Sequence, residues 1–275
     1  MRGAMKEKIK LGMNVKTSMS DITGNVIRVR EYADQYISGT LAELEVENYG
    51  NTQDYFFRDG TITVTEEERR QQLSKIPVEY AGKYAKDFKF ELYGSDISAQ
   101  KKIANSFVLN FKKYLMSGNG LYIFSKTKGT GKTMLACVLA NELIKKSDAC
   151  GLNVKYVTAQ GYIEMIRERT GEAYTYKDCT LLIFDDIGSE TSREDSWTKA
   201  PVFDLVNYRY SNHLPTIYTS NFPMDELKED ERTIDRIVSS SAPIALPNVP
   251  IRRQQGLKEI SRFMRETDVS ENIFD

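Results

Sequence analysis

Strand-length and helix-length apolar segments alternate along the chain from residue 97 onward. Apolar residues recur every four positions over 98–116, at Ile103, Phe107, Phe111 and Leu115, which predicts a helix with one apolar face. Further helices are predicted over 134–147, 160–169, 199–212 and 224–238. Short apolar runs predict strands over 121–124, 154–157, 181–184, 216–219 and 244–246. Such alternation predicts an α/β fold, with a five-stranded parallel sheet flanked by helices on both faces.

The first 90 residues follow a different pattern. Short β-like runs at 41–46 and 61–65 lie among turn signals such as Asp59-Gly60. Aromatic residues between positions 80 and 90 are expected to lean on the next domain. We therefore predict three parts along the chain. They are a small N-terminal appendage over 1–90, whose fold the pattern leaves open, a core over 91–255, and a C-terminal helix or tail over 256–275.

The strand predicted at 121–124 runs into a glycine-containing loop that is followed by an apolar helix. Strand, glycine loop and helix in this order form the context of a P-loop, in which backbone N–H groups and the helix N-terminus surround a phosphate. In this arrangement Lys132 reaches the β- and γ-phosphates and the Thr133 hydroxyl holds Mg²⁺. The alternative is a glycine turn that merely joins strand to helix. The predicted nucleotide-binding residues are Gly129, Thr130, Gly131, Lys132 and Thr133.

Lys126 departs from the P-loop pattern, because it stands where the first glycine of G-x-x-x-x-G-K-[ST] belongs. A non-glycine residue forced to positive φ costs about 1–2 kcal/mol. Backbone strain would follow only if Lys126 takes a positive φ, and the sequence leaves open whether this residue weakens nucleotide binding.

A second motif closes the apolar run 181–184 with two adjacent carboxylates, Asp185 and Asp186. Parallel sheets present ligands at the carboxyl ends of their strands, so Asp185 is expected beside the P-loop, holding Mg²⁺ directly or through water. Asp186 is expected to point towards the γ-phosphate and to orient or deprotonate a water. Alone, the pair could be a strand-ending turn; together with the P-loop it predicts a nucleoside triphosphatase that uses Mg²⁺.

Later positions add candidates that the residues alone leave open. Asn221 follows the strand predicted at 216–219 and could lie near the γ-phosphate or simply end the strand. Arg236 could act on the phosphates of a neighbouring subunit, or it could pair with Glu231 or Asp235. The pair Arg252-Arg253 could reach back to the nucleotide or remain exposed.

Composition is that of a globular protein, with 28% charged and 40% hydrophobic residues. The net charge of −1 provides no global field that attracts nucleic acid. Three cysteines and one histidine lack the spacing of a zinc site. There is no apolar run of about 18 residues, and the basic first 16 residues lack the apolar segment of a signal peptide. We therefore expect a cytoplasmic protein with no membrane segment.

Five motifs together carry a family resemblance. They are Ile-Phe-Ser-x-x-x-Gly-Thr-Gly-Lys-Thr, Leu-Leu-Ile-Phe-Asp-Asp-Ile-Gly, Thr-Ser-Asn, Ile-Asp-Arg-Ile and Ile-Arg-Arg, in this order. Over residues 76–255 the chain resembles the DnaC/DnaI group of AAA+ helicase loaders, close kin of the IstB transposition helpers. The resemblance implies an AAA+ P-loop NTPase core with a truncated lid. It also implies that residues 1–90 dock a partner, although they lack the cysteines and histidines of a zinc-bearing docking domain.

The resemblance also implies a role for each candidate residue. Lys132 and Thr133 serve the phosphates and Mg²⁺, and Asp185 is the Walker B metal ligand. Asp186 takes the catalytic acid position, one methylene shorter than the usual glutamate, which implies slow hydrolysis. The remaining implied roles are sensor 1 for Asn221, the trans-acting finger for Arg236 and sensor 2 for Arg253.

The implied function is that of an ATPase that loads a replicative ring helicase onto single-stranded DNA. The implied partners are that helicase, the DNA and further copies of this chain. One alternative is an IstB-like helper whose partner is a transposase, and another is a nucleotide-gated adaptor with negligible turnover. The residues that could contact DNA are Tyr162, Arg167, Arg169, Tyr174 and Tyr176, although such tyrosines also pack at core edges.

Overall fold

The computed structural model describes residues 12, 14–16, 23–33, 38–46, 52–58, 70–71, 73–146, 152–189 and 196–267. The chain divides into two compact units, Met1–Leu73 and Ser74–Asp275. Each unit is described by itself below.

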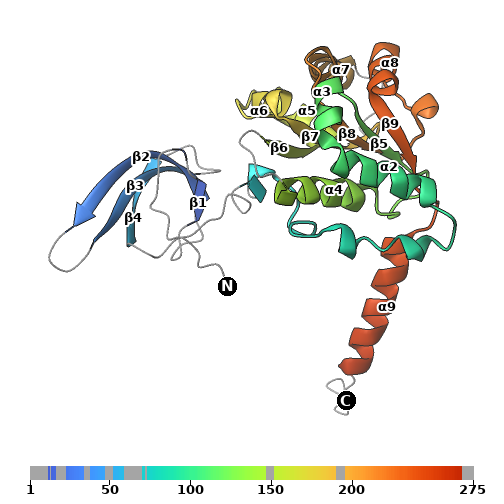
Figure 1. Cartoon of the computed structure of the whole chain (residues 1–275), viewed down its shortest axis with the longest axis horizontal. Coiled ribbons are helices and arrows are strands. Elements are labelled where there is room, and N and C mark those ends of the chain that lie inside the picture. Colours follow the sequence, from blue (N-terminus) through green and yellow to red (C-terminus); the bar gives the residue numbers. More distant parts are fainter. Residues whose placement is uncertain are drawn as a thin grey trace, which may run out of the picture. The chain divides into compact units, whose positions relative to one another are not determined.

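The described part of the first unit contains an antiparallel sheet in which each strand pairs with the next along the chain (Figure 1). The run predicted at 41–46 lies in this sheet, whereas 61–65 falls outside the described residues. Pairing between the second and third strands shifts register between Val26 and Arg28. The strands are β1 (Asn14–Lys16), β2 (Thr23–Ala33), β3 (Ser38–Val46) and β4 (Thr52–Arg58).

The boundary between the units lies at Leu73/Ser74 rather than near residue 90, where the sequence pattern placed it. Ile76, Tyr80, Phe88 and Tyr93 are all buried in the core of the second unit. Two short 3₁₀ helices, η1 (Ala85–Asp87) and η2 (Phe90–Tyr93), carry part of this segment. The aromatic residues that were expected to lean on the core are therefore part of it.

A five-stranded parallel sheet forms the centre of the second unit, as predicted. The strand order is β6-β7-β8-β5-β9. The strand predicted last begins three residues earlier than expected, and the other strands differ by one to three residues from the prediction. The strands are β5 (Gly120–Phe124), β6 (Val154–Thr158), β7 (Leu181–Ile187), β8 (Thr216–Ser220) and β9 (Ser241–Ala245).

Helices cover both faces of this sheet (Figure 1). Side chains of β5 alternate between the two cores, since Leu121 and Ile123 face one and Tyr122 faces the other. The helices on the first face are α2 (Ser98–Leu109), α3 (Phe111–Ser117) and α4 (Lys132–Lys146). Those on the second face are α5 (Ala159–Arg167), α6 (Ala173–Asp178), α7 (Ser196–Ser211) and α8 (Glu231–Ser240).

Three helix predictions need correction. The helix predicted over 98–116 is two helices, because Asn110 leaves helical geometry at φ −113° and ends α2. The region predicted as one helix over 224–238 begins as the 3₁₀ helix η3 (Met224–Glu226), and α8 starts only after Asp230. Asp230 caps α8, since its side chain accepts a hydrogen bond from the Arg232 N–H. The six-residue helix α6 was not predicted, because it is too short to show an apolar period.

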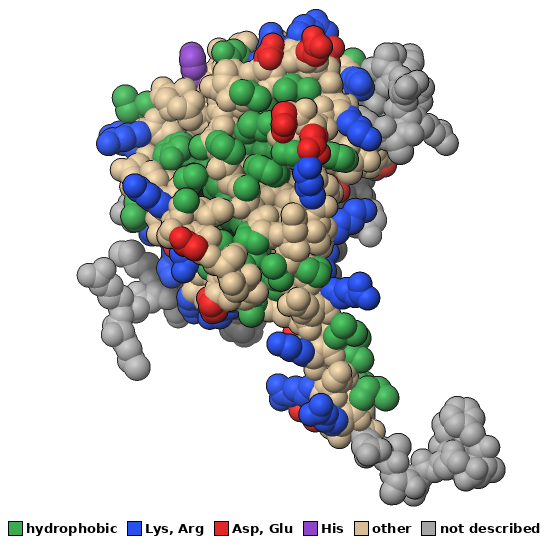
Figure 2. All heavy atoms as spheres, turned by 90° about the vertical axis from the view of Figure 1, so that its right-hand side faces the viewer, with side chains coloured by type: hydrophobic (Ala, Val, Ile, Leu, Met, Phe, Trp, Pro, Cys, Tyr) green, Lys and Arg blue, Asp and Glu red, His purple; other side chains and the backbone are tan. Residues whose placement is uncertain are grey.

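The last described helix, α9 (Ile251–Glu266), confirms the amphipathic segment expected after residue 255. It projects from the second unit, with hydrophobic side chains gathered along one side and basic ones along the other (Figure 2). Its apolar residues are Leu257, Ile260, Phe263 and Met264, each 59–63% exposed. Among the described residues, no helix is both long and apolar enough to cross a bilayer.

Gly120 is required by close packing in the middle of the sheet, and this gives a stability test. A Cβ at this position would overlap the Thr216 carbonyl oxygen and lie 2.7 Å from the Thr216 nitrogen. We expect Gly120→Ala to lower the free energy of unfolding by about 1–3 kcal/mol or more, measured by chemical denaturation. Gly171→Ala is the control, because nothing lies within 4 Å of its Cβ position. Equal stability of the two variants would contradict the close approach.

Candidate nucleotide-binding site

The loop between β5 and α4 has the backbone conformation of a phosphate-binding loop. Gly129 and Gly131 have φ values of 73° and 95°, in the left-handed region that favours glycine. Helix α4 begins at Lys132, so its unpaired N–H groups and partial positive charge lie at the loop. The Tyr93 hydroxyl donates to the Thr130 carbonyl at 2.6 Å, which holds the loop from the side of the core.

Lys126 does not have a positive φ, so the strain considered from the sequence is absent at this position. Among the described residues, the non-glycine residues with positive φ are Lys75, Arg169, Asp186 and His213. The Lys126 side chain is exposed and forms an ion pair with Glu226 of η3. A turn that keeps φ negative at Lys126 has no need of glycine there.

Lys132 lies inside the loop rather than in solvent. Its side chain is buried, and its ammonium donates to the carbonyl oxygens of Ser125 at 3.4 Å and Thr127 at 3.2 Å. Burial lowers the pKa of Lys132, whereas the nearby carboxylates of Asp186 and Asp185 oppose that shift. The structure therefore places a desolvated cation within the phosphate-binding loop, where its attraction for an anion is weakly screened.

Asp185 is buried and accepts hydrogen bonds from three hydroxyl groups. Its Oδ1 accepts from Thr133 at 2.9 Å and from Thr219 at 2.5 Å, and its Oδ2 accepts from Tyr156 at 2.8 Å. Burial raises the pKa of Asp185, and these three hydrogen bonds act in the opposite direction. The P-loop threonine and this carboxylate thus lie together, as the motif spacing predicted.

Asp186 adopts an uncommon backbone conformation that turns it away from the strand. Its φ is 60°, at a point where the pairing of β7 with β8 shifts register. A non-glycine residue in this region costs on the order of 1–3 kcal/mol. Its N–H donates to Thr219 Oγ1 at 2.9 Å, and Asn221 Nδ2 donates to its Oδ1 at 2.8 Å. Two candidate residues from adjacent strands are therefore joined directly.

These groups line one pocket of the second unit, with a volume of about 880 Å³. The phosphate-binding loop forms one wall, and the carboxyl ends of β6, β7 and β8 contribute Asp185, Asp186 and Asn221. Residues of the segment before η1, including Tyr80, and of α9, including Arg252, complete the lining. This volume lies in the usual range for small-molecule sites, and the position at the strand ends is where parallel α/β sheets bind ligands.

Arg252, and not Arg253, lies at this pocket. The Arg252 N–H donates to the Gly129 carbonyl at 2.9 Å, and its guanidinium donates to the Tyr80 hydroxyl at 2.8 Å. Burial raises the pKa of Tyr80 to about 12, so this hydroxyl stays protonated beside the arginine. Arg253 is exposed and is not among the residues that line the pocket. Of these two adjacent arginines, Arg252 is therefore the one that lies at the pocket.

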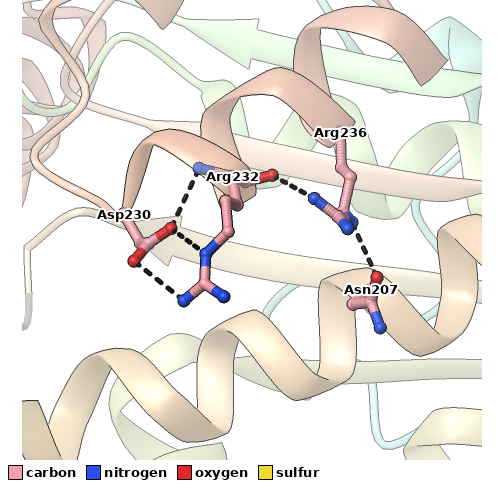
Figure 3. A network of polar contacts seen from close by, with 4 residues as sticks. All are labelled: Asn207, Asp230, Arg232 and Arg236. Atoms are coloured by element: carbon pink, nitrogen blue, oxygen red, sulfur yellow. Dashed lines mark hydrogen bonds and ion pairs between the residues drawn. The ribbon is translucent and has the colours of Figure 1, made fainter.

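Arg236 is not among the residues that line this pocket, and its side chain extends from α8 towards Asn207 of α7 (Figure 3). Its Nε donates to Asn207 Oδ1 at 2.7 Å and its Nη1 to the Arg232 carbonyl at 2.9 Å. Neither Glu231 nor Asp235 pairs with it, so the salt bridge considered from sequence is not formed.

The aromatic residues considered for DNA contact are mostly core residues. Tyr162 and Tyr176 are buried in the core beneath α5 and α6, where their rings meet at 6.5 Å between centroids. Buried rings are unable to stack on bases. Tyr174, which is 70% exposed, is the one tyrosine of this set whose ring is accessible.

Four residues of the site were missed from the sequence: Tyr80, Tyr93, Tyr156 and Thr219. The three tyrosines contribute hydroxyl groups from segments that carry no motif. For Tyr156, which lies on β6, the sequence pattern of a strand does not show whether the hydroxyl forms a hydrogen bond. Thr219 had a usable signal, because it stands two residues before Asn221 at the end of a strand next to the carboxylates.

Curated proteins with similar sequences include helicase loaders. The chain is 33% identical to the replicative helicase loader DnaI of Bacillus subtilis over 146 residues, which cover 47% of this chain and 46% of that protein. It is 30% identical to the replicative helicase loader DnaC of Escherichia coli K12 over 126 residues, covering 42% and 49%. The chain thus matches about half the length of these relatives. No known protein-family model matches the chain.

Solved structures share the fold. A primosome component of Streptococcus pyogenes superposes with a TM-score of 0.51 at 23% identity, covering 64% of this chain and 94% of that chain. A DnaI structure gives the same TM-score and identity, covering 66% and 100%. At this identity the likeness concerns the fold alone.

A first prediction separates the two adjacent arginines. Arg252→Ala should weaken ATP binding by roughly 10–100-fold, the usual loss for a hydrogen bond to a charged group, measured by titration with a fluorescent ATP analogue. Arg253→Ala is the matched control and should bind as the parent protein does. Weaker ATP binding by Arg253→Ala, with the parent affinity kept in Arg252→Ala, would contradict this prediction.

A second prediction concerns the ionisation of Asp185. Tyr156→Phe removes a hydrogen bond that lowers the pKa of Asp185, so that pKa should rise further. Because the metal requires the ionised carboxylate, Mg²⁺-dependent ATP binding should be lost at a higher pH than in the parent protein as the pH falls. Affinity measured across pH tests this. Tyr114→Phe, which removes a hydroxyl bonded to Ser106 on the first face of the sheet, should leave the profile unchanged.

Proposed function

We propose that this chain is an ATP-dependent loader of a replicative ring helicase, like the DnaI and DnaC proteins to which it is 33% and 30% identical. The observation that carries the proposal is the single pocket in which Lys132, Thr133, Asp185, Asp186 and Asn221 converge. Relatives named as helicase loaders match 47% and 42% of the chain. The proposal has three parts: the role as a loader, the identity of the partners, and the hydrolysis of ATP.

The residues at the phosphate end fit ATP with Mg²⁺. Backbone N–H groups of Gly129, Thr130 and Gly131 surround the β-phosphate, and Lys132 leaves its loop carbonyls for the β- and γ-phosphates. Thr133 and Asp185 offer the oxygen ligands that Mg²⁺ prefers, and their existing hydrogen bond holds them on the same side of the pocket. Bound Mg²⁺ would neutralise charge on the phosphate oxygens.

Hydrolysis requires a water placed against the γ-phosphate, and Asp186 is the group proposed to accept its proton. Asn221 fixes the orientation of that carboxylate through the 2.8 Å hydrogen bond. Arg252 is proposed to bind phosphate within the same chain, whereas Arg236 would reach the nucleotide of a neighbouring copy. The short side chain of Asp186 keeps its carboxylate farther from the γ-phosphate than a glutamate would, which favours slow turnover and use as a switch.

In this proposal nucleotide binding closes neighbouring copies around the pocket, and the assembly delivers a ring helicase to single-stranded DNA in the cytoplasm. The first unit is proposed as the region that docks the helicase. The second candidate is an IstB-like helper of a transposase, which would use the same pocket. The loader is preferred because the named relatives are loaders.

A complementation experiment tests the proposal. Lys132→Ala should abolish ATP binding, and Arg236→Ala should bind ATP yet lose about 10³-fold or more in turnover, since an arginine finger contributes ~10³–10⁵. A mixture of the two should recover part of the activity, because a mixed interface joins an intact loop to an intact arginine. The measurements are phosphate release with single-stranded DNA and loading of the replicative helicase from the same genome.

Each variant measured alone is the control for the mixture. If the parent protein loads the helicase without detectable release of phosphate, it is a nucleotide-gated adaptor and not an ATPase. Turnover without binding to the helicase would remove the loader and favour the transposase helper.

A further inference from the structure

Two arginines lie one turn apart on α8 but differ in how their charges are compensated (Figure 3). Arg232 is paired with Asp230, at 2.9 Å from Nε to Oδ1 and 3.2 Å from Nη2 to Oδ2. Arg236 has no carboxylate partner among the described residues. The structure thus neutralises one arginine and leaves the full charge on the other.

Arg236 is nevertheless held in a defined direction by α7. Phe203, Asn207 and Tyr210 are spaced four and three residues apart, so they share one face of that helix. The guanidinium carbon of Arg236 lies 5.1 Å from the ring centroid of Phe203 and 6.0 Å from that of Tyr210. Asn207 Oδ1 accepts from its Nε at 2.7 Å. The arginine is therefore supported by two rings and one amide.

The partners of Arg236 are uncharged, and this decides whether its positive charge is neutralised. A carboxylate at position 207 would orient the guanidinium equally well, but it would also neutralise it. A neutral amide and aromatic faces orient the group and leave its positive charge for another anion. Two of the guanidinium nitrogens, Nε and Nη1, have acceptors, and among the described residues none is recorded for Nη2. One donor edge thus remains for an oxygen from outside the chain.

We propose that Asn207 is a positioning residue, which together with the Phe203 ring presents the Arg236 guanidinium to the γ-phosphate of a nucleotide bound by a second copy of this chain. This inference rests on the proposed function, since it requires that the pocket be completed by a neighbouring copy. It adds that the arginine is prearranged before the copies meet, so that little ordering is needed at the interface.

Asn207→Ala tests this proposal. The variant should bind ATP with the parent affinity and lose turnover by about 10²-fold, the scale expected when a catalytic group is displaced by about 1 Å. Mixing it with Lys132→Ala should restore part of the turnover, as with Arg236→Ala, because the defect lies on the donor side of the interface. Asn212→Ala is the control, since Asn212 lies just beyond the end of α7 and its side chain donates to the Tyr208 carbonyl. It should behave as the parent protein.

Asn207→Asp separates positioning from folding. It keeps the acceptor and adds a partner for Arg236, so the thermal midpoint should be maintained or rise while turnover falls at least as far as in Asn207→Ala. A merely structural Asn207 predicts the opposite, with stability lost in Asn207→Ala and activity kept in Asn207→Asp.

The variants distinguish failure of this inference from failure of the proposed function. If Arg236→Ala loses turnover and Asn207→Ala does not, the positioning role is overturned and the loader ATPase stands. If Arg236→Ala keeps its turnover, the arginine does not act across the interface and both ideas about Arg236 fall. If Asn207→Ala loses turnover and mixing with Lys132→Ala does not restore it, the inference is also overturned.

Discussion

The candidate site depends on one buried carboxylate that is saturated by hydroxyl groups. Asp185 accepts hydrogen bonds from Thr133, Thr219 and Tyr156, which belong to the start of α4, the end of β8 and β6. An ionised group without such partners would be costly to bury, so the three hydroxyls compensate part of that cost. The same hydrogen bonds tie the start of α4, next to the glycine loop, to the central strands, which fixes the distance between the loop and this carboxylate.

Thr219 connects Asp185 to the next residue of the pair, Asp186. Its hydroxyl donates to Asp185 and accepts from the N–H of Asp186, so one side chain holds both carboxylates of the pair. The register shift between β7 and β8 gives Asp186 its positive φ and directs its side chain towards Asn221 rather than back into the sheet. Strain at this position is thus coupled to the geometry proposed for water activation, in keeping with the tendency of strained residues to occur at functional sites.

Arg252 and Arg236, which lie in the Ile-Arg-Arg and Ile-Asp-Arg-Ile motifs, are both oriented by uncharged groups. Arg252 is anchored by the Gly129 carbonyl and the Tyr80 hydroxyl at the pocket, and Arg236 is anchored by Asn207 on another face of the unit. Neither has a carboxylate partner among the described residues, whereas Arg232 does. A neutral anchor orients an arginine without cancelling its charge, which is the requirement for binding phosphate.

The sequence by itself determined the parallel sheet, the phosphate-binding loop and the adjacency of Thr133 to Asp185. These follow from apolar periodicity and from the geometry of parallel strands, which are local or nearly local properties. Only the tertiary structure decided that Arg252 rather than Arg253 reaches the pocket, that Lys126 is unstrained, and that residues 74–90 belong to the second unit. Such outcomes depend on the rotation of a helix about its axis, on backbone angles and on long-range burial, and a linear pattern specifies none of these.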